Sequence, residues 1–174
     1  MSIATIQAAI RDIPDFPKPG ILFKDISPVL QDPAVFRDTI DCLCAPFLAE
    51  PPDTVVAIDA RGFIFGSAMA YKLGCGLTMV RKKGKLPWRT IAASYDLEYG
   101  SNTVEIHADA FTPGARVLLV DDVLATGGTA RAAVELVEKL GGKVVAICFL
   151  MELTFLPGRD QLAGHQIVSL VKVS

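Results

Sequence analysis

The sequence predicts one α/β domain built on a mostly parallel sheet flanked by helices. Strongly apolar runs, of the kind buried on both faces of a parallel sheet, alternate with segments of helical periodicity; residues 117–120, followed by the helical pattern after Thr129, are the clearest case. A chain of 174 residues with 51% hydrophobic residues can bury a core of its own. No internal repeat or linker divides it, so we expect a single domain over residues 1–174.

Composition and charge disfavour several classes of protein. A net charge of -2 and a pI near 5.7 provide no basic field for nucleic acid. No apolar run approaches the roughly 18 residues of a membrane-spanning helix, and no basic stretch precedes an apolar one at the N-terminus. The four cysteines contain no Cys-x-x-Cys pair. We therefore expect a cytoplasmic protein with buried, reduced thiols and without nucleic-acid or membrane partners.

Prolines and helical spacing organise the first fifty residues. Residues 3–10 are expected to form a short amphipathic helix, and the proline-rich segment 12–20 is expected to be an irregular arm, ahead of the apolar segment 21–23. Asp32 and Pro33 then start a helix, because Asp accepts hydrogen bonds from the first turn and Pro suits the first helical position. The apolar face of this helix carries Phe36, Ile40, Leu43 and Phe47.

The middle of the chain contains two buried strands and a hairpin. Residues 54–58 form a short apolar run after a Pro-Pro break, and the helix that follows runs to about Leu73. A second buried strand is expected at 77–80. Residues 90–95 and 104–106 alternate loosely between apolar and polar, which indicates a two-stranded excursion able to fold over a site.

The last third continues the alternation of helix and strand. In the helix after Thr129, Glu135 and Lys139 are spaced for an ion pair on the outer side, and a Gly-Gly pair ends the helix. Its inner face carries Ala133, Leu136, Val137 and Leu140. The remaining elements are expected to be a strand at 144–151, a short helix near Asp160 and a strand at 167–171.

The segment between the central strand and its helix has the composition of an anion-binding loop. The first turn of a helix offers unpaired N–H groups and a partial positive charge, and glycines let a phosphate approach the backbone. Replacing Gly127 by Val is therefore expected to block the phosphate while leaving the fold intact. The segment lacks the Lys of a nucleotide-triphosphate loop and the G-x-G-x-x-G spacing of a dinucleotide loop. We call the following residues the phosphate loop: Ala125, Thr126, Gly127, Gly128 and Thr129.

Two acids, Asp121 and Asp122, stand just before the phosphate loop. They would repel a phosphate, but carboxylates accept hydrogen bonds from hydroxyl groups. The pair therefore suits the vicinal diol of a ribose whose 5-phosphate occupies the loop. The alternative is a Gly-rich turn in an unrelated α/β domain, in which the acids only cap the helix.

Residues 117–129 resemble the phosphoribosyl-pyrophosphate signature of the type I phosphoribosyltransferases. Further stretches at 14–28, 61–63, 81–87 and 94–100 resemble the adenine phosphoribosyltransferases of this family in order and spacing, over nearly the whole chain. The signature is shared by relatives that use other bases, so the adenine assignment depends on the N-terminal stretch and on Leu-Glu-Tyr-Gly near residue 98. The resemblance implies a type I phosphoribosyltransferase-like fold with a small N-terminal hood (about 1–30) and a flexible, projecting flap (about 82–106).

The reaction implied by the resemblance is transfer of the 5-phosphoribosyl group from phosphoribosyl pyrophosphate to adenine, which gives AMP and pyrophosphate in purine salvage. Mg²⁺ is the expected cofactor, held by the substrate's phosphates, diol and waters, with Asp121 and Asp122 at most assisting and with no direct protein ligand. The expected partners are these small molecules and a second copy of the chain in a homodimer.

The resemblance also assigns the pyrophosphate and the base to residues outside the phosphate loop. Arg61 supplies charge to the pyrophosphate, and relatives hold this loop with a cis peptide bond, here Asp59–Ala60. Arg81 is expected at a two-fold interface, reaching toward the neighbouring site. The pyrophosphate-binding residues are Asp59, Ala60, Arg61, Arg81, Lys82 and Lys85. The adenine-binding residues are Leu22, Phe23, Lys24 and Val123, with the main chain of Leu22 and Lys24 at the base edge and Phe23 near its face.

Several of these residues have simpler interpretations. Phe23 is of a type often found in plain core packing, and Asp59 and Arg61 are spaced for a surface salt bridge. The basic run 81–85 is of the kind that usually forms a solvated face.

Glu98 is the predicted proton acceptor. Glu98 and Arg61 are the expected catalytic residues. Adenine attacks through N9, which must end without its proton. The other nearby acids are committed to the ribose or lie on the pyrophosphate side, and the resemblance points to the same carboxylate. A flap that closes with Glu98 and Tyr99 would desolvate this carboxylate and raise its pKa. The alternative is that Glu98 is only a solvating charge.

Two other functions stay open. A sibling transferase for hypoxanthine, guanine or xanthine must recognise an acceptor where adenine presents a donor, so competition among bases separates the two. A non-catalytic sensor would bind phosphoribosyl pyrophosphate or AMP without turnover. A purine-linked repressor on this fold is disfavoured, because it would also need a DNA-binding domain.

Overall fold

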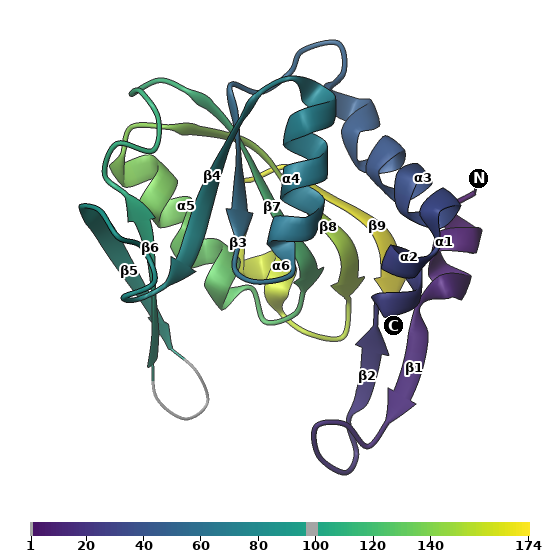
Figure 1. Cartoon of the computed structure of the whole chain (residues 1–174). Coiled ribbons are helices and arrows are strands. Elements are labelled where there is room, and N and C mark those ends of the chain that lie inside the picture. Colours follow the sequence, from purple (N-terminus) through teal and green to yellow (C-terminus); the bar gives the residue numbers. More distant parts are fainter. Residues whose placement is uncertain (1, 97–100) are drawn as a thin grey trace. The chain divides into compact units, whose positions relative to one another are not determined.

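The computed structural model describes residues 2–96 and 101–174. The chain divides into an N-terminal unit, Met1–Cys42, and a larger unit, Leu43–Ser174. The predicted alternation of strands and helices is confirmed in the larger unit, which carries the phosphate loop (Figure 1).

The N-terminal unit contains a two-stranded antiparallel ribbon between helices α1 (Ile3–Ala9) and α2 (Ser27–Gln31). Strand β1 (Arg11–Pro14) pairs with β2 (Leu22–Asp25), so the expectation that residues 12–20 are wholly irregular was wrong. Pro14 is tolerated because it lies at the end of the ribbon, where a missing N–H removes little pairing. The partner strand lies beyond a turn, and local sequence does not reveal such a pairing.

Helix α3 (Pro33–Cys44) begins where the sequence predicts. The Asp32 carboxylate accepts hydrogen bonds from the backbone N–H groups of Ala34 and Val35, at 2.8 and 3.0 Å. These bonds satisfy two of the donors that a helix start leaves unpaired. A short 3-10 turn, η1 (Ala45–Phe47), follows the helix.

The larger unit is organised around a seven-stranded sheet with the order β5-β6-β4-β3-β7-β8-β9. The five neighbouring strands β4, β3, β7, β8 and β9 are parallel. The hairpin β5–β6 extends the sheet beyond β4 in antiparallel pairing. This confirms the mostly parallel sheet. The strands are β3 (Thr54–Ile58), β4 (Gly76–Lys82), β5 (Thr90–Asp96), β6 (Ser101–His107), β7 (Arg116–Leu124), β8 (Lys143–Leu153) and β9 (Ile167–Val173). The helices are α4 (Gly62–Leu73), α5 (Gly128–Lys139) and α6 (Gly158–Gln161).

Helices α4 and α5 cover opposite faces of this sheet (Figure 1). Val55 and Ala57 of β3 face α4, where a Cβ atom on Gly66 would lie 2.5 Å from the Cβ of Ala57. The alternate residues Val56 and Ile58 belong to the core on the α5 face. Strand β3 is buried along its whole length for this reason, as its continuous apolar run predicted.

The predicted two-stranded excursion is the hairpin β5–β6. It is continuous with the main sheet, because Arg81 and Lys82 of β4 pair with Glu105 and Val104 of β6. The connection 97–100, which includes Glu98 and Tyr99, lies outside the described residues.

The four cysteines are free thiols, as predicted, but only Cys44 and Cys148 are fully buried. Burial raises the pKa of the Cys148 thiol, which favours its neutral form. Cys42 and Cys75 are half-buried, which corrects the expectation that all four are buried. Among the residues that the structure describes, no helix is both long and apolar enough to cross a membrane.

Candidate active site

The candidate site lies at the carboxyl ends of three neighbouring parallel strands. Strand β7 ends at the phosphate loop, β3 ends before Asp59, and β4 carries Arg81 near its end. Because β3 pairs in parallel with both β4 and β7, these ends meet at one edge of the sheet. This edge is where open α/β sheets bind ligands.

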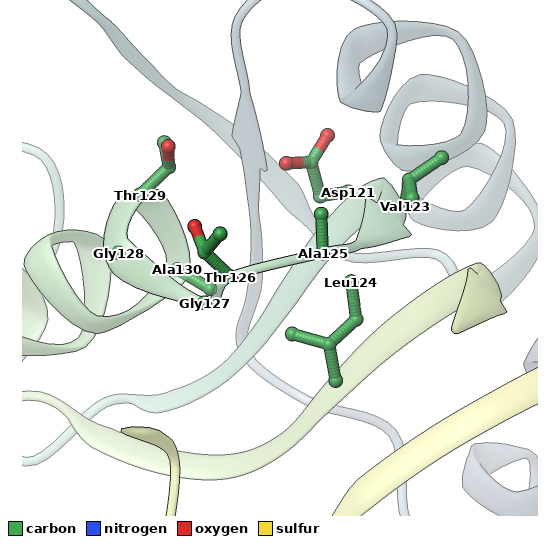
Figure 2. A pocket seen from close by; sticks show the side chains of 9 residues that line it. All are labelled: Asp121, Val123, Leu124, Ala125, Thr126, Gly127, Gly128, Thr129 and Ala130. Atoms are coloured by element: carbon green, nitrogen blue, oxygen red, sulfur yellow. The ribbon is translucent and has the colours of Figure 1, made fainter. Parts of the chain in front are cut away.

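The phosphate loop forms a pocket of about 80 Å³ between the end of β7 and the start of α5. Figure 2 shows the Asp121 carboxylate on the β7 side of this pocket and the hydroxyl groups of Thr126 and Thr129 on the helix side. All five predicted residues of the loop line the pocket, as does Val123. A helix of twelve residues starts here, so its unpaired N–H groups and its positive dipole end point at the pocket.

Gly127 occupies a position that only glycine suits. Its φ is +85°, and a Cβ atom there would lie 2.7 Å from the carbonyl oxygen of Gly158 and 2.9 Å from Cβ of Gln161. The backbone at Gly127 therefore lies close to helix α6, as well as to any bound phosphate. This corrects the expectation for Gly127→Val, which would disturb the backbone and the packing of α6 and would not leave the fold intact.

Tyr95 of β5 lies against the start of α5, and the sequence did not identify it. A Cβ atom on Gly128 would lie 2.9 Å from Cδ2 of the Tyr95 ring. The hydroxyl of Thr129 donates a hydrogen bond to the phenolic oxygen of Tyr95, with an Oγ1–Oη distance of 2.8 Å. No local signal could have revealed this contact, because the two residues are 34 positions apart and belong to different elements.

The two acids after the apolar part of β7 are close to each other and to Arg61. Asp121 Oδ1 accepts a hydrogen bond from the Asp122 N–H at 2.8 Å, and Arg61 Nε lies 2.7 Å from Asp122 Oδ2. The Asp122 residue is only 4% exposed. Burial, and then the adjacent charge of Asp122, raise the pKa of Asp121 well above its usual value.

Asp122 Oδ2 is a buried acceptor whose hydrogen bonding is incomplete. Among the described residues, none donates it a hydrogen bond of good geometry, although the Arg61 guanidinium is close enough for an ion pair. Gly62 brings α4 close to this point, since a Cβ there would lie 2.8 Å from the Val120 carbonyl oxygen and 3.0 Å from Asp121 Oδ1. Buried polar atoms of this kind need a partner, which a bound ligand can supply.

The predicted pyrophosphate residues gather at the ends of β3 and β4. The Asp59–Ala60 peptide bond is cis, as predicted. Arg81 Nε donates to Asp59 Oδ2 at 2.9 Å, and Arg81 Nη1 donates to the Lys85 carbonyl oxygen at 3.3 Å. Arg81 is thus held within its own chain beside the cis bond. The side chains of Lys82 and Lys85 are exposed.

Three of the predicted adenine residues, Leu22, Phe23 and Lys24, lie on β2 in the N-terminal unit. The Phe23 ring packs edge-on against Phe16, with ring centroids 5.1 Å apart. Lys24 Nζ forms an ion pair with Asp12 at 2.6 Å, so its charge is already engaged. The predicted catalytic Glu98 and the adjoining Tyr99 lie outside the part of the chain that the structure describes.

Comparison with known proteins identifies similar sequences and folds. Residues 40–161 match the family model described as a phosphoribosyl transferase domain. An adenine phosphoribosyltransferase of Carboxydothermus hydrogenoformans is 58% identical over 163 residues, which are 94% of this chain and 96% of that protein. The crystal structure of the adenine phosphoribosyltransferase of Thermoanaerobacter pseudethanolicus superposes with a TM-score of 0.95 at 52% identity, covering 99% of this chain and 100% of that one.

A more distant structure carries ligands. The adenine phosphoribosyltransferase of Saccharomyces cerevisiae is 40% identical with a TM-score of 0.91, and the similarity covers 97% of each chain. It was crystallised with adenine and D-2,5-dideoxy-2,5-imino-altritol 1,6-bisphosphate.

Proposed function

Because the chain belongs to the phosphoribosyl transferase family, and within it to the adenine phosphoribosyltransferases, we propose that the carboxyl edge of its parallel sheet is the active site. The enzyme transfers the 5-phosphoribosyl group of phosphoribosyl pyrophosphate to adenine and so forms AMP and pyrophosphate in purine salvage. The observation that carries the assignment of the site is that the phosphate loop and Asp121 line one pocket, with Asp122 hydrogen-bonded to Asp121 beside it.

The phosphate loop binds the 5-phosphate of the substrate. Its backbone N–H groups and the hydroxyl groups of Thr126 and Thr129 supply donors, and the dipole of α5 favours the negative charge. The cavity has room for one tetrahedral group, and Gly127 and Gly128 line it. These contacts fix one end of the substrate and leave the anomeric carbon to be positioned by the ribose contacts.

Asp121 and Asp122 bind the ribose diol. The buried Asp122 Oδ2 supports this role, because it is paired with Arg61 but accepts no hydrogen bond of good geometry from the described residues, and a ribose hydroxyl could donate one. The raised pKa of Asp121 favours a neutral carboxyl group, which can donate as well as accept a hydrogen bond.

Arg61, with Arg81, Lys82 and Lys85, stabilises the leaving pyrophosphate, next to the backbone of Asp59 and Ala60. Breaking the anomeric C–O bond transfers negative charge to the pyrophosphate, so a positive group held at the strand end accelerates that step. The 2.7 Å distance between Arg61 Nε and Asp122 Oδ2 supports this role, because it holds the guanidinium beside the acids proposed to bind the ribose.

The donor set suits a magnesium ion that arrives with the substrate. Among the described residues, no group of three or more His, Cys, Asp or Glu side chains is arranged to hold a metal. Asp121 and Asp122 offer the oxygen ligands that Mg²⁺ prefers, but only from one side. When bound, the ion would neutralise pyrophosphate charge, and Asp121 and Asp122 would orient the diol.

The residues proposed to contact the base are Leu22, Phe23, Lys24 and Val123. The main chain of Leu22 and Lys24 reads the adenine edge and Phe23 packs near its face, while Lys24's charge stays on Asp12. Glu98 accepts the adenine proton, with Tyr99 beside it. The base lies opposite the leaving group, as displacement at the anomeric carbon requires.

The enzyme is proposed to act in the cytoplasm because its substrates are charged. It is proposed to be a homodimer because its α4 face is apolar. Leu77 and Met79 pair in register with Val55 and Ala57, which face α4, so all four point to the α4 side of the sheet. Leu77 and Met79 are nevertheless 45% and 41% exposed, and Ile64 of α4 is 40% exposed. We call Ile64, Leu77 and Met79 the α4 patch. A second copy would cover it and bring Arg81 toward the neighbouring site.

Turnover of different bases tests the assignment of substrate. Purified protein should convert labelled adenine to AMP in the presence of phosphoribosyl pyrophosphate and Mg²⁺, and should convert hypoxanthine, guanine and xanthine at least a hundredfold more slowly, because a site built for the adenine donor leaves groups unpaired with a 6-oxopurine. Preference for a 6-oxopurine would identify the sibling activity. Tight binding without turnover would identify a sensor.

A further inference from the structure

We infer that Tyr95 is a positioning residue for the 5-phosphate, acting through the hydroxyl group of Thr129. The inference rests on the proposed role of the phosphate loop. Tyr95 does not line the pocket, whereas Thr129 does. The structure connects the two through the 2.8 Å hydrogen bond between Thr129 Oγ1 and Tyr95 Oη.

The position of Tyr95 is fixed from two sides. Its ring lies against Gly128, where no side chain larger than hydrogen fits. Its strand neighbour across the hairpin is Asn102, which is paired with Tyr95 in the β5–β6 register, and Asn102 Nδ2 makes a long contact of 3.5 Å to Tyr95 Oη. The phenolic oxygen is therefore approached by a donor from β6 and by a donor from α5.

The direction of the Thr129 hydrogen bond determines what the hydroxyl can do. A threonine hydroxyl has one proton and two lone pairs, and here the proton is directed at Tyr95. In this state Thr129 cannot donate to a phosphate. If the Tyr95 hydroxyl instead donates its own proton to Thr129 Oγ1, the Thr129 proton is released for the phosphate.

The reversed direction of the Thr129–Tyr95 hydrogen bond is favoured when a phosphate is bound. Tyr95 then donates to Thr129, and Thr129 donates to the anion; each bond polarises the next, and the last is charge-assisted. Tyr95 thus keeps Thr129 in the rotamer that faces the phosphate. Because Tyr95 belongs to the hairpin β5–β6, phosphate binding and the position of this hairpin are coupled.

A purely packing role for Tyr95 predicts a different result from the relay. Tyr95→Phe keeps the ring against Gly128 and removes only the hydroxyl. Packing alone would leave substrate binding unchanged in this variant. The relay predicts weaker binding of phosphoribosyl pyrophosphate, with little change in the KM for adenine.

The experiment is a double-mutant cycle on the full chain, read as the dissociation constant of phosphoribosyl pyrophosphate by calorimetry. We expect Tyr95→Phe to weaken binding about five- to tenfold and Thr129→Ala about tenfold or more, since each disrupts a hydrogen bond to a charged group. The double variant should bind no more than about twofold more weakly than Thr129→Ala alone. Thr129→Ser, which keeps the hydroxyl, should retain sensitivity to Tyr95→Phe.

Control variants separate the possible failures. Tyr71→Phe removes the same group from a residue of α4 that is 93% exposed, and it should leave binding unchanged. Unchanged binding in Tyr95→Phe, or additive losses in the double variant, would overturn the relay alone. Unchanged binding in Thr129→Ala would overturn the role of Thr129 in the phosphate loop and the relay with it. Melting temperatures of all variants within a few degrees of the parent show that folding is intact.

Discussion

At the scale of single residues, two arginines of the site are paired with carboxylates before substrate is present. Arg61 lies against Asp122 and Arg81 against Asp59, at 2.7 and 2.9 Å. Each pair holds a flexible arginine near the place where the pyrophosphate is proposed to bind, which reduces the side-chain entropy lost on binding. Arg61 is half exposed, so its pair contributes little to stability and can be exchanged for a substrate contact.

The proposed role of Glu98 leads to the first prediction at this scale. Glu98→Gln removes the proton acceptor but keeps the size of the side chain, so the turnover number should fall by roughly 10² to 10⁴, the usual effect of a positioned acid or base. The affinity for phosphoribosyl pyrophosphate should change little. Rapid-quench single-turnover transfer measures the chemical step directly. A rate within a few-fold of the parent would mean that the proton goes to water.

At the scale of elements, helix α6 packs against the phosphate loop. Gly158 and Gln161 abut Gly127, and Gln161 accepts a hydrogen bond from Arg131 of α5 at 3.0 Å. Arg159 of the same helix binds both carboxylate oxygens of Glu152 on β8, at 2.8 and 2.6 Å. The bidentate pair therefore attaches α6 to the sheet and keeps the loop's support in place.

The Glu152–Arg159 pair predicts a pH dependence of stability. Hydrogen bonds from Arg159, and also from Ser169, lower the pKa of Glu152 from 4.5 to about 2, despite its burial at 3% exposure. Because the folded pKa lies below the unfolded one, the stabilisation is fully present above about pH 4.5 and is lost as the pH falls toward 2. Its upper limit is about 3 kcal/mol, at 1.36 kcal/mol per pKa unit.

Denaturant unfolding between pH 7 and pH 3 measures this contribution. Glu152→Gln should lower the free energy of unfolding at pH 7 by on the order of 2 kcal/mol and should flatten its decline in acid. The matched control is Glu138→Gln on the exposed side of α5. If the parent and Glu152→Gln lost stability in parallel down to pH 3, the pair would contribute nothing.

The sequence could predict those elements whose signals are local. The fully apolar runs of β3, β7 and β8 and the Asp32 cap are visible in short windows, and each is where it was expected. Strand β1 was missed because its partner lies across a turn and its proline argued against pairing. Within the site, the phosphate loop was readable as a motif. Tyr95 and Gly158 were not, since they meet the loop only through tertiary packing.

At the scale of the whole molecule, the α4 patch and Arg81 raise the question of how many chains build one site. The α4 patch exposes the apolar side chains of Ile64, Leu77 and Met79, and this exposure does not stabilise a monomer. Arg81 is held by Asp59 of its own chain at 2.9 Å. In a homodimer formed through the patch, Arg81 could act either in its own site or in the neighbouring one. The two arrangements differ in whether a monomer retains turnover.

The last prediction separates these arrangements. Leu77→Glu combined with Met79→Glu places two like charges from each chain in the proposed interface, so the variant should sediment as a monomer where the parent sediments as a dimer. Leu48→Glu, at a site 55% exposed and outside the patch, is the matched control and should stay dimeric. A parent that is monomeric at micromolar concentration, or a variant that remains dimeric, would contradict the proposed interface. If Arg81 serves the neighbouring site, the monomer should also lose turnover. A folded monomer with full activity would show that Arg81 acts beside Asp59 in its own chain.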